Sequence, residues 1–250
     1  TNLKEYYPTK KELEILSKYK SEIGKKLPKK SPIVEFGSGS NKKINQFIKS
    51  LNLPNEYVPI DISKEYLFNN ASMVARRFSN LKVTAICADF SQTKKLRNYI
   101  VKKKNIVSFF PGSTIGNYLP KDAKKLLKKF SQIIGKNSHL VVGVDLVKNK
   151  KILEKAYNDR EGITAKFNKN ILKVINSKYG LNFNLSNFEH KAFYNVKKNR
   201  IEMHLSAKKN FSQVLNKKNI KFSKGETIHT ENSHKYTKNK FSQLAQNSGF

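Results

Sequence analysis

The sequence predicts an α/β fold: a parallel, doubly wound sheet with a second, smaller α+β element inserted late in the chain. Two observations carry this prediction. Between Pro32 and Leu146, short apolar runs alternate with segments whose apolar residues recur at helical spacing. After Asp145, two helical segments lead into runs with the two-residue alternation of antiparallel strands.

The predicted sheet has five strands, at residues 33–36, 56–61, 82–90, 105–112 and 139–146. The segment after the first strand places its apolar side chains at i, i+3, i+4 and i+7, on one helical face: Ile44, Phe47, Ile48 and Leu51. A second helix follows Ser63, a suitable N-cap, and another begins at Pro120, a residue favoured in the first helical turn. Sheets of this kind bind ligands outside the carboxyl ends of their strands.

The later part of the chain predicts a different architecture. Helices are expected at about 149–159 and 163–178. Residues 189–209 have the alternation of a hairpin, a further strand is expected at about 226–231, and residues 241–250 are expected to form a last helix. We interpret the α+β part as an element that covers the substrate.

The formal net charge of +32 is carried mostly by lysine. A surface so basic attracts polyanions, so nucleic acid is kept as an alternative partner. The lysines are nevertheless scattered in pairs along the chain, and no block of them is interleaved with aromatic residues. Arginine, which reads phosphates and guanine edges best, occurs only at Arg76, Arg77, Arg97, Arg160 and Arg200. We therefore interpret the lysines as a solvated surface.

The single cysteine, Cys87, excludes an internal disulfide and a cysteine-rich metal site, and its apolar neighbours predict a buried thiol. No apolar stretch approaches the roughly twenty residues of a membrane span, and no signal peptide is visible. These observations predict a soluble, cytoplasmic protein without membrane contact.

The stretch IVEFGSGSNKK places two glycines directly after the first strand. Gly37 and Gly39 allow a sharp turn and leave no Cβ to collide with a ligand. Asp61 closes the second strand, where a carboxylate can accept hydrogen bonds from ribose hydroxyls, and Asp89 closes the third, where it could meet an adenine amino group. The third glycine of the dinucleotide fingerprint is absent, so the pattern favours an adenosine without phosphate, as in S-adenosylmethionine (SAM). Either aspartate could instead cap the helix that follows it.

A series of motifs spans nearly the whole chain: EYYPT (5–9), EFGSGS (35–40), YVPIDIS (57–63), ADF (88–90), FPGSTIGN (110–117), GVDLVK (143–148), AYND (156–159), GITAKFN (162–168), FEHKAFYN (188–195), RIEMHL (200–205) and TENSHKY (230–236). In these motifs and their order the chain resembles the ergothioneine-pathway L-histidine Nα-methyltransferases, which convert histidine to its trimethylated betaine, hercynine. GSTIGN and IEMHL are the most specific of them. The resemblance implies a Rossmann-like class I SAM-dependent methyltransferase sheet with an inserted α+β substrate-binding domain.

The resemblance also implies where the two domains begin and end. Residues 12–147, completed by 236–250, would form the SAM-binding core, and residues 148–235 together with 1–11 would form the substrate-binding domain. Family members continue beyond both ends of this chain, so we expect it to lack amino- and carboxyl-terminal segments of the family.

One set of residues implied by the resemblance would hold the cosubstrate SAM: Gly37, Gly39, Lys43, Asp61, Asp89 and Phe90. No metal is expected. The histidines of the later part show no metal-ligand spacing with cysteine: His190, His204, His229 and His234.

A second set implied by the resemblance would bind the amino acid. Asn117 and Tyr157 would hold its α-amino and carboxylate ends, and Tyr7 would lie near it. Of these, catalysis is assigned to Asn117 and Tyr7. The side-chain pocket would be formed by Met203, with Glu231 and Ser233 as hydrogen-bond partners of the imidazole.

Two alternatives stay open on the sequence alone. The same machinery could methylate another α-amino acid, since relatives act on other amino acids such as prenylated tryptophan. In a different class, the charge could mark a nucleic-acid-binding protein or an RNA methyltransferase, although the sequence contains no DPPY or NPPY tetrapeptide for amino-base methylation. For the leading interpretation we expect a small-molecule amino-acid substrate, no specific nucleic acid and a monomer.

Overall fold

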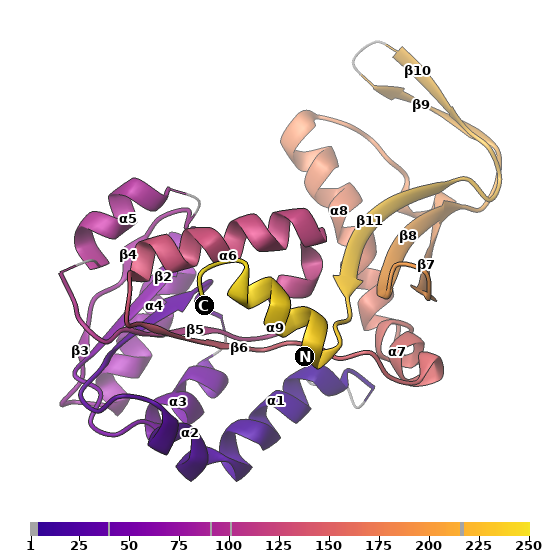
Figure 1. Ribbon diagram of the computed structural model, residues 1–250. Helices are drawn as coiled ribbons and strands as arrows, with labels where there is room; N and C mark the ends of the chain where they lie inside the picture. The colour runs from indigo at the N-terminus through magenta and orange to yellow at the C-terminus, as the bar shows by residue number, and fades with distance from the viewer. Residues whose placement is uncertain (1–4, 40, 91, 101, 216–217) are drawn as a thin grey trace. The chain divides into compact units, whose positions relative to one another are not determined.

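A computed structural model describes residues 5–39, 41–90, 92–100, 102–215 and 218–250 (Figure 1). The chain divides into two compact units. The first comprises Pro8–Asp145 and Thr237–Phe250, and the second comprises Leu146–Tyr236 with the amino-terminal residues up to Tyr7. Residues 1–4 of the predicted segment 1–11 lie outside the described residues. Which ligand each unit holds stays a prediction.

The first unit contains a parallel sheet in the strand order β3-β2-β1-β5-β6, and β4 also pairs with β2. Its strands are β1 (Pro32–Phe36), β2 (Glu56–Asp61), β3 (Lys82–Val83), β4 (Ile86–Cys87), β5 (Val107–Phe110) and β6 (His139–Val142). The order confirms the predicted doubly wound fold. The predicted strand 82–90 is in fact two short strands, both beside β2.

Helices cover both faces of this sheet (Figure 1). The helices of the first unit are α1 (Tyr7–Lys18, whose first residue belongs to the second unit), α2 (Lys20–Lys26), α3 (Asn41–Ser50), α4 (Lys64–Arg77), α5 (Thr93–Ile100), α6 (Pro120–Ile134) and α9 (Lys238–Gln246), with a 3-10 turn at Thr114–Asn117. Helix α3 packs against α4, and α5 packs against α6. The apolar faces of α3 and α6 are buried as their spacing predicts. At the core, the rings of Phe36 and Phe130 stack with centroids 3.8 Å apart.

Cys87 is exposed, so the prediction of a buried thiol is wrong. It lies on the two-residue strand β4, too short to enclose its side chains, and its Sγ is 3.7 Å from the carbonyl oxygen of Ile62. The described residues contain no helix with the length and apolar character that crossing a membrane requires.

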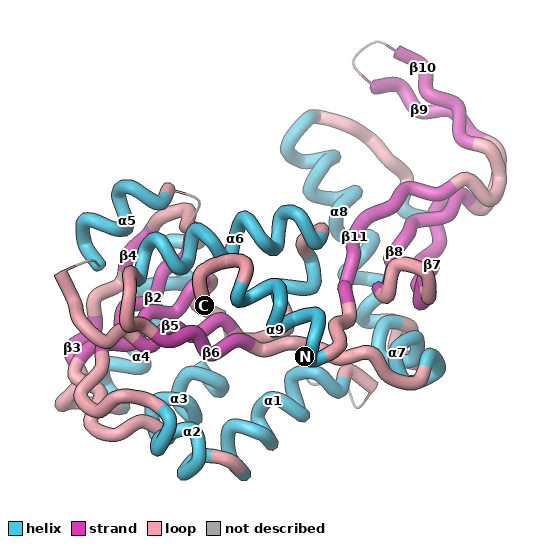
Figure 2. The backbone as a smooth tube through the Cα atoms, in the orientation of Figure 1, coloured by secondary structure: helices cyan, strands magenta, loops and turns pink. Residues whose placement is uncertain are grey.

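The second unit is built on an antiparallel sheet in the order β11-β8-β7 (Figure 2). Its elements are α7 (Lys150–Tyr157), α8 (Ile163–Tyr179), a 3-10 turn at Leu185–Asn187, β7 (Phe188–Asn195), β8 (Arg200–Ala207), β9 (Phe211–Leu215), β10 (Lys218–Phe222) and β11 (Thr227–His234). Strands β7, β8 and β11 correspond to the predicted hairpin and third strand, and β9 and β10 form a second hairpin that was not predicted. Alternate residues of β8 are buried under α7 and α8: Ile201, Met203, Leu205 and Ala207.

Candidate active site

The strand order of the parallel sheet reverses between β1 and β5, which makes the carboxyl ends of these strands the expected ligand site. Gly37 follows β1 directly and has φ +73°, a left-handed conformation that favours glycine. Its amide donates to the carbonyl of Ile60, 2.9 Å away, and a Cβ on it would meet no atom within 4 Å. The turn therefore leaves open space at the end of β1.

The turn leads into helix α3, whose first residues carry polar atoms that are buried without partners. Both side-chain polar atoms of Asn41 and the Oδ1 of Asn45 have no hydrogen-bond partner within the described part of the chain. Buried polar atoms in native proteins are nearly always paired with protein, water or ligand. Unpaired amide groups beside the glycine turn fit a polar ligand at this place, as SAM would be.

Side chains of two helices, α4 and α1, hold the glycine turn and the start of α3 in place. The buried side chain of Asn70, on α4, donates to the carbonyl of Gly39 at 3.0 Å. Lys43, in the first turn of α3, forms an ion pair with Glu12 of α1. The predicted cosubstrate residues Gly37, Gly39 and Lys43 thus lie together after β1.

Asp61 and Asp89 lie at the carboxyl ends of two neighbouring strands, β2 and β4. Asp61 ends β2, and its backbone carbonyl accepts from the amide of Ala88, one residue before Asp89, at 3.0 Å. The Oδ1 of Asp61 also accepts from the amide of Ser63 at 2.8 Å. This bond closes an Asx turn just before α4, whose N-cap is Ser63. A carboxylate has further acceptor sites, so this bond does not exclude a ribose contact.

Phe90 and Asn117 complete the first unit's predicted residues. The ring of Phe90 packs edge-on against Phe36 at 6.4 Å and Phe130 at 5.7 Å, so the aromatic core fixes its position. Asn117 ends the 3-10 turn that follows β5, and its side chain is exposed.

Beneath the glycine turn lies a buried acid. Glu35 is 1% exposed and accepts a hydrogen bond from the hydroxyl of Tyr57. Burial raises the pKa of Glu35 to about 8, because the charged form has lost its water, and the hydrogen bond from Tyr57 offsets this only in part. Glu35 is not among the residues that the sequence predicts for the site.

In the second unit, Tyr157 and Ser233 are in direct contact. The Tyr157 hydroxyl donates to the Ser233 Oγ at 2.8 Å, and both residues are buried. Lys235 is also buried, and its ammonium donates to Ser233 Oγ at 2.8 Å and to the Tyr157 hydroxyl at 3.3 Å. The sequence offered no way to select Lys235 from so many lysines, although it lies only two residues after Ser233.

Met203 and Glu231 lie opposite each other on β8 and β11. Met203 packs in a buried apolar cluster with Leu153, Tyr157 and Ile201. Glu231 is half-buried; its burial raises the pKa of the carboxyl above its ordinary value, while the charge of Lys235 lowers it. The second unit therefore places the carboxyl of Glu231 near the apolar side chain of Met203 and near the hydroxyls of Tyr157 and Ser233.

Tyr7 packs against the same apolar cluster. Its hydroxyl accepts from the Lys148 ammonium at 3.0 Å, and that ammonium lies 4.5 Å from the centroid of the Tyr7 ring. The neighbouring Tyr6 packs edge-on against Tyr157 at 6.0 Å. Five residues predicted to surround the substrate thus gather in the second unit: Tyr7, Tyr157, Met203, Glu231 and Ser233.

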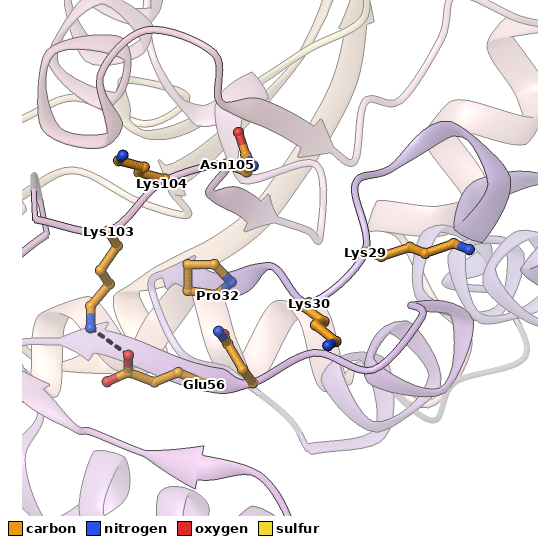
Figure 3. Close-up of a pocket in the computed structure, with 8 residues that line it drawn as sticks. Lys29, Lys30, Pro32, Glu56, Lys103, Lys104 and Asn105 are labelled. Atoms are coloured by element: carbon orange, nitrogen blue, oxygen red, sulfur yellow. Dashed lines mark hydrogen bonds and ion pairs between the residues drawn. The ribbon is translucent and has the colours of Figure 1, made fainter.

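A pocket of about 370 Å³ lies at the other end of the parallel sheet (Figure 3). It includes Pro32 and Glu56, the first residues of β1 and β2, and the Lys103 ammonium pairs with Glu56 (Figure 3). Because cosubstrate binding in such sheets uses the carboxyl ends of the strands, this pocket is not part of the candidate active site.

Three possible metal-binding side chains also meet in the second unit: Glu202, His204 and His229. The rings of His204 and His229 stack with centroids 4.5 Å apart and planes 8° from parallel. The lone pairs of parallel rings do not converge on one ion. Glu202 is held by the Arg200 guanidinium at 2.7 Å. We interpret this group as a stacked and hydrogen-bonded cluster, and the absence of a metal stays a prediction.

Comparisons with known proteins show which family this sequence is similar to. The histidine N-alpha-methyltransferase of Mycobacterium tuberculosis (strain CDC 1551 / Oshkosh) is 34% identical over 210 residues, which are 83% of this chain and 64% of that protein. The histidine N-alpha-methyltransferase of Mycolicibacterium smegmatis is 31% identical over 98% of this chain and 77% of its own length. The ergothioneine biosynthesis protein 1 of Neurospora crassa is 32% identical over 72% of this chain and 21% of its own length.

The chain thus spans somewhat less than two thirds of the length of the first of these relatives, at 64%. A family model described as "Histidine-specific methyltransferase, SAM-dependent" matches residues 1–250. The chain therefore belongs to the family of SAM-dependent, histidine-specific methyltransferases.

Proposed function

We propose that this protein transfers three methyl groups from SAM to the α-amino nitrogen of L-histidine and so forms hercynine, a step of ergothioneine biosynthesis. Family membership and the names of the relatives support the class of reaction. The observation that carries the choice of substrate is the cluster of Tyr157, Met203, Glu231 and Ser233, which combines an apolar wall with a carboxyl and hydroxyls. An imidazole ring has apolar faces and an N–H donor, so it fits this combination.

The proposed cosubstrate site lies at the carboxyl ends of β1, β2 and β4. Gly37 leaves room for the ligand, Asp61 accepts hydrogen bonds from the ribose hydroxyls, and Phe90 borders the adenine. Asp89 accepts from the adenine amino group, and Lys43 faces the methionine part. When bound there, SAM supplies the methyl group as a sulfonium.

Each transfer is an in-line displacement. The new N–C bond forms as the C–S bond breaks, and S-adenosylhomocysteine leaves as a neutral thioether. The chain must hold the neutral amine about 3–3.5 Å from the methyl carbon, opposite the sulfur. Asn117 and Tyr7 are proposed to hold the amine, because amide and phenol groups can both accept from it and donate.

A free α-amine titrates near pH 8, so a useful fraction is neutral without a strong base. The proton of each of the first two products is lost to water before the next transfer, and the third product carries no N–H. The amine pocket must therefore be polar but uncrowded enough for a trimethylated nitrogen.

The role of Glu231 is tested with histidines that carry a methyl group on one ring nitrogen. Methylation of either ring nitrogen leaves a neutral imidazole without an N–H. If Glu231 accepts that N–H, both isomers will lose kcat/KM by about 10- to 100-fold relative to histidine, because the acceptor is left unpaired. In E231Q the difference between histidine and the two isomers should shrink, because the glutamine amide can donate to a ring nitrogen that carries no proton. Equal use of both isomers and histidine by the wild-type chain would contradict the assignment.

A further inference from the structure

Glu12, which the sequence did not single out, lies at the reversal point of the parallel sheet. Its Oε1 and Oε2 accept from the amide of Gly112 at 2.8 and 3.0 Å, and it pairs with the Lys43 ammonium. Gly112 is two residues beyond β5, and Lys43 lies in the first turn of the helix that follows β1. The Glu12 carboxylate therefore sits at the carboxyl ends of the two central strands, where ligands of such sheets bind.

The absence of a side chain at Gly143 leaves the space that the Glu12 carboxylate occupies. Gly143 directly follows β6, and a Cβ on it would lie only 1.9 Å from Glu12 Oε1 and 3.0 Å from the Gly112 nitrogen. Any larger residue at position 143 would displace Glu12 or the backbone. The side chains of Lys43 and Glu12 are only 11% and 16% exposed. A mostly buried ion pair adds little to stability, because desolvation offsets the attraction, so stability alone does not explain it.

We propose that Glu12 binds the α-ammonium group of the methionine part of SAM, while Lys43 binds its α-carboxylate. This rests on the proposed SAM-dependent function. The methionine part of SAM is a zwitterion. Its ammonium would pair with Glu12 and its carboxylate with Lys43, so the net charge of the buried site would stay zero. Glu12 retains acceptor capacity beside the Gly112 amide, because a carboxylate offers about four lone-pair sites.

A merely structural role is the competing explanation, since Glu12 also ties α1 to the segment after β5. The two are separated by calorimetry with four ligands. S-adenosylhomocysteine has both charged groups, its decarboxylated analogue has only the ammonium, its deaminated analogue has only the carboxylate, and 5′-methylthioadenosine has neither.

In E12Q we expect affinity for the two ammonium-bearing ligands to fall about 10- to 100-fold, as for loss of a hydrogen bond to a charged group. Affinity for the deaminated analogue and for 5′-methylthioadenosine should change less than about twofold. A thermal melt shows whether E12Q is folded. E14Q is the matched control on the same helix, because Glu14 is exposed and pairs only with Lys11 among the ion pairs of the described residues; it should leave all four affinities unchanged.

An equal loss for all four ligands would show a structural role and overturn the proposal, and so would an unchanged affinity for S-adenosylhomocysteine. If the wild-type chain binds none of the four, the cosubstrate assignment itself fails. That outcome differs from a failure of Glu12 alone, in which the wild type binds and E12Q shows no selective loss.

Discussion

The Lys235 ammonium lies 2.8 Å from the Ser233 hydroxyl, inside the second unit, and Lys235 is only 3% exposed. It also donates to the Tyr157 hydroxyl, so one buried cation orients the two hydroxyl groups that we propose to bind the substrate. A buried charge is costly unless it is hydrogen-bonded and balanced. Its charge lowers the pKa of Glu231, against the burial that raises it. We therefore propose that Lys235 is a positioning residue of the proposed histidine pocket.

Replacing Lys235 by Met removes these donors and keeps most of the side-chain volume. We expect K235M to raise KM for histidine by about 10- to 100-fold, because Tyr157 and Ser233 lose their common partner. Affinity for S-adenosylhomocysteine should stay within about twofold of the wild-type value. Steady-state kinetics and calorimetry measure the two effects. K198M, which changes an exposed lysine in the turn between β7 and β8, is the control; an unchanged KM in K235M would refute the positioning role.

Asp61 is predicted to have two separable roles. In D61N the amide oxygen can still accept from the Ser63 backbone, so the thermal midpoint should stay close to that of the wild type. The loss of the negative acceptor should weaken S-adenosylhomocysteine binding about tenfold. D61A removes the Asx-turn hydrogen bond as well and should also lower the free energy of unfolding by about 1 kcal/mol. If D61N binds S-adenosylhomocysteine as tightly as the wild type does, Asp61 serves only the turn before α4.

Glu35 makes stability depend on pH. Its pKa is near 4.5 when unfolded and about 8 when folded, so the unfolded chain loses its proton first as pH rises. Stability is therefore lost between about pH 4.5 and pH 8. E35Q has no carboxyl at this position and lacks this loss. Between pH 5 and pH 8, its free energy of unfolding relative to that of the wild type should therefore rise by on the order of 3 kcal/mol.

Thermal melts at these two pH values measure that gain, which corresponds to roughly 6–12 °C in the midpoint. E22Q, which changes an exposed carboxylate on α2, should show no such pH-dependent gain. A constant difference between E35Q and the wild type across this range would contradict a raised pKa at Glu35.

The lysine-rich surface gives a prediction for the alternative class. We expect RNA to associate only through its phosphates, so binding should fall steeply between about 50 mM and about 200 mM salt. Gel shifts at several salt concentrations test this. Tight binding that survives the higher salt, or preference for one RNA sequence, would favour a nucleic-acid substrate instead.

The parallel sheet could be predicted because its strands are buried on both faces. Strands β1 and β2 read as short apolar runs followed by helices with one-sided apolar faces, and both were found at or within a residue of the expected positions. The hairpin of β9 and β10 was missed because its strands are short and carry many polar side chains, as in KNIKF. Cys87 was misplaced because the strand around it breaks into two-residue pieces.

Residues of the candidate site could be selected from the sequence where they lie at the end of a predicted strand or within a family motif. Gly37 and Asp61 stand at such ends, and their geometry is read directly from the order of elements. Glu12 and Lys235 could not be selected in this way. Glu12 meets Gly112 across a separation of 100 residues, and Lys235 differs from other lysines only by its burial. Such contacts exist only once the chain has folded.

The most direct test of the proposed function is mass spectrometry of the chain incubated with SAM and an equimolar panel of amino acids. We predict that histidine alone gains one, two and finally three methyl groups on its α-nitrogen. A product that stops at one methyl would contradict the uncrowded amine pocket. Methylation of another amino acid, with histidine untouched, would contradict the substrate assignment of Glu231 and Ser233.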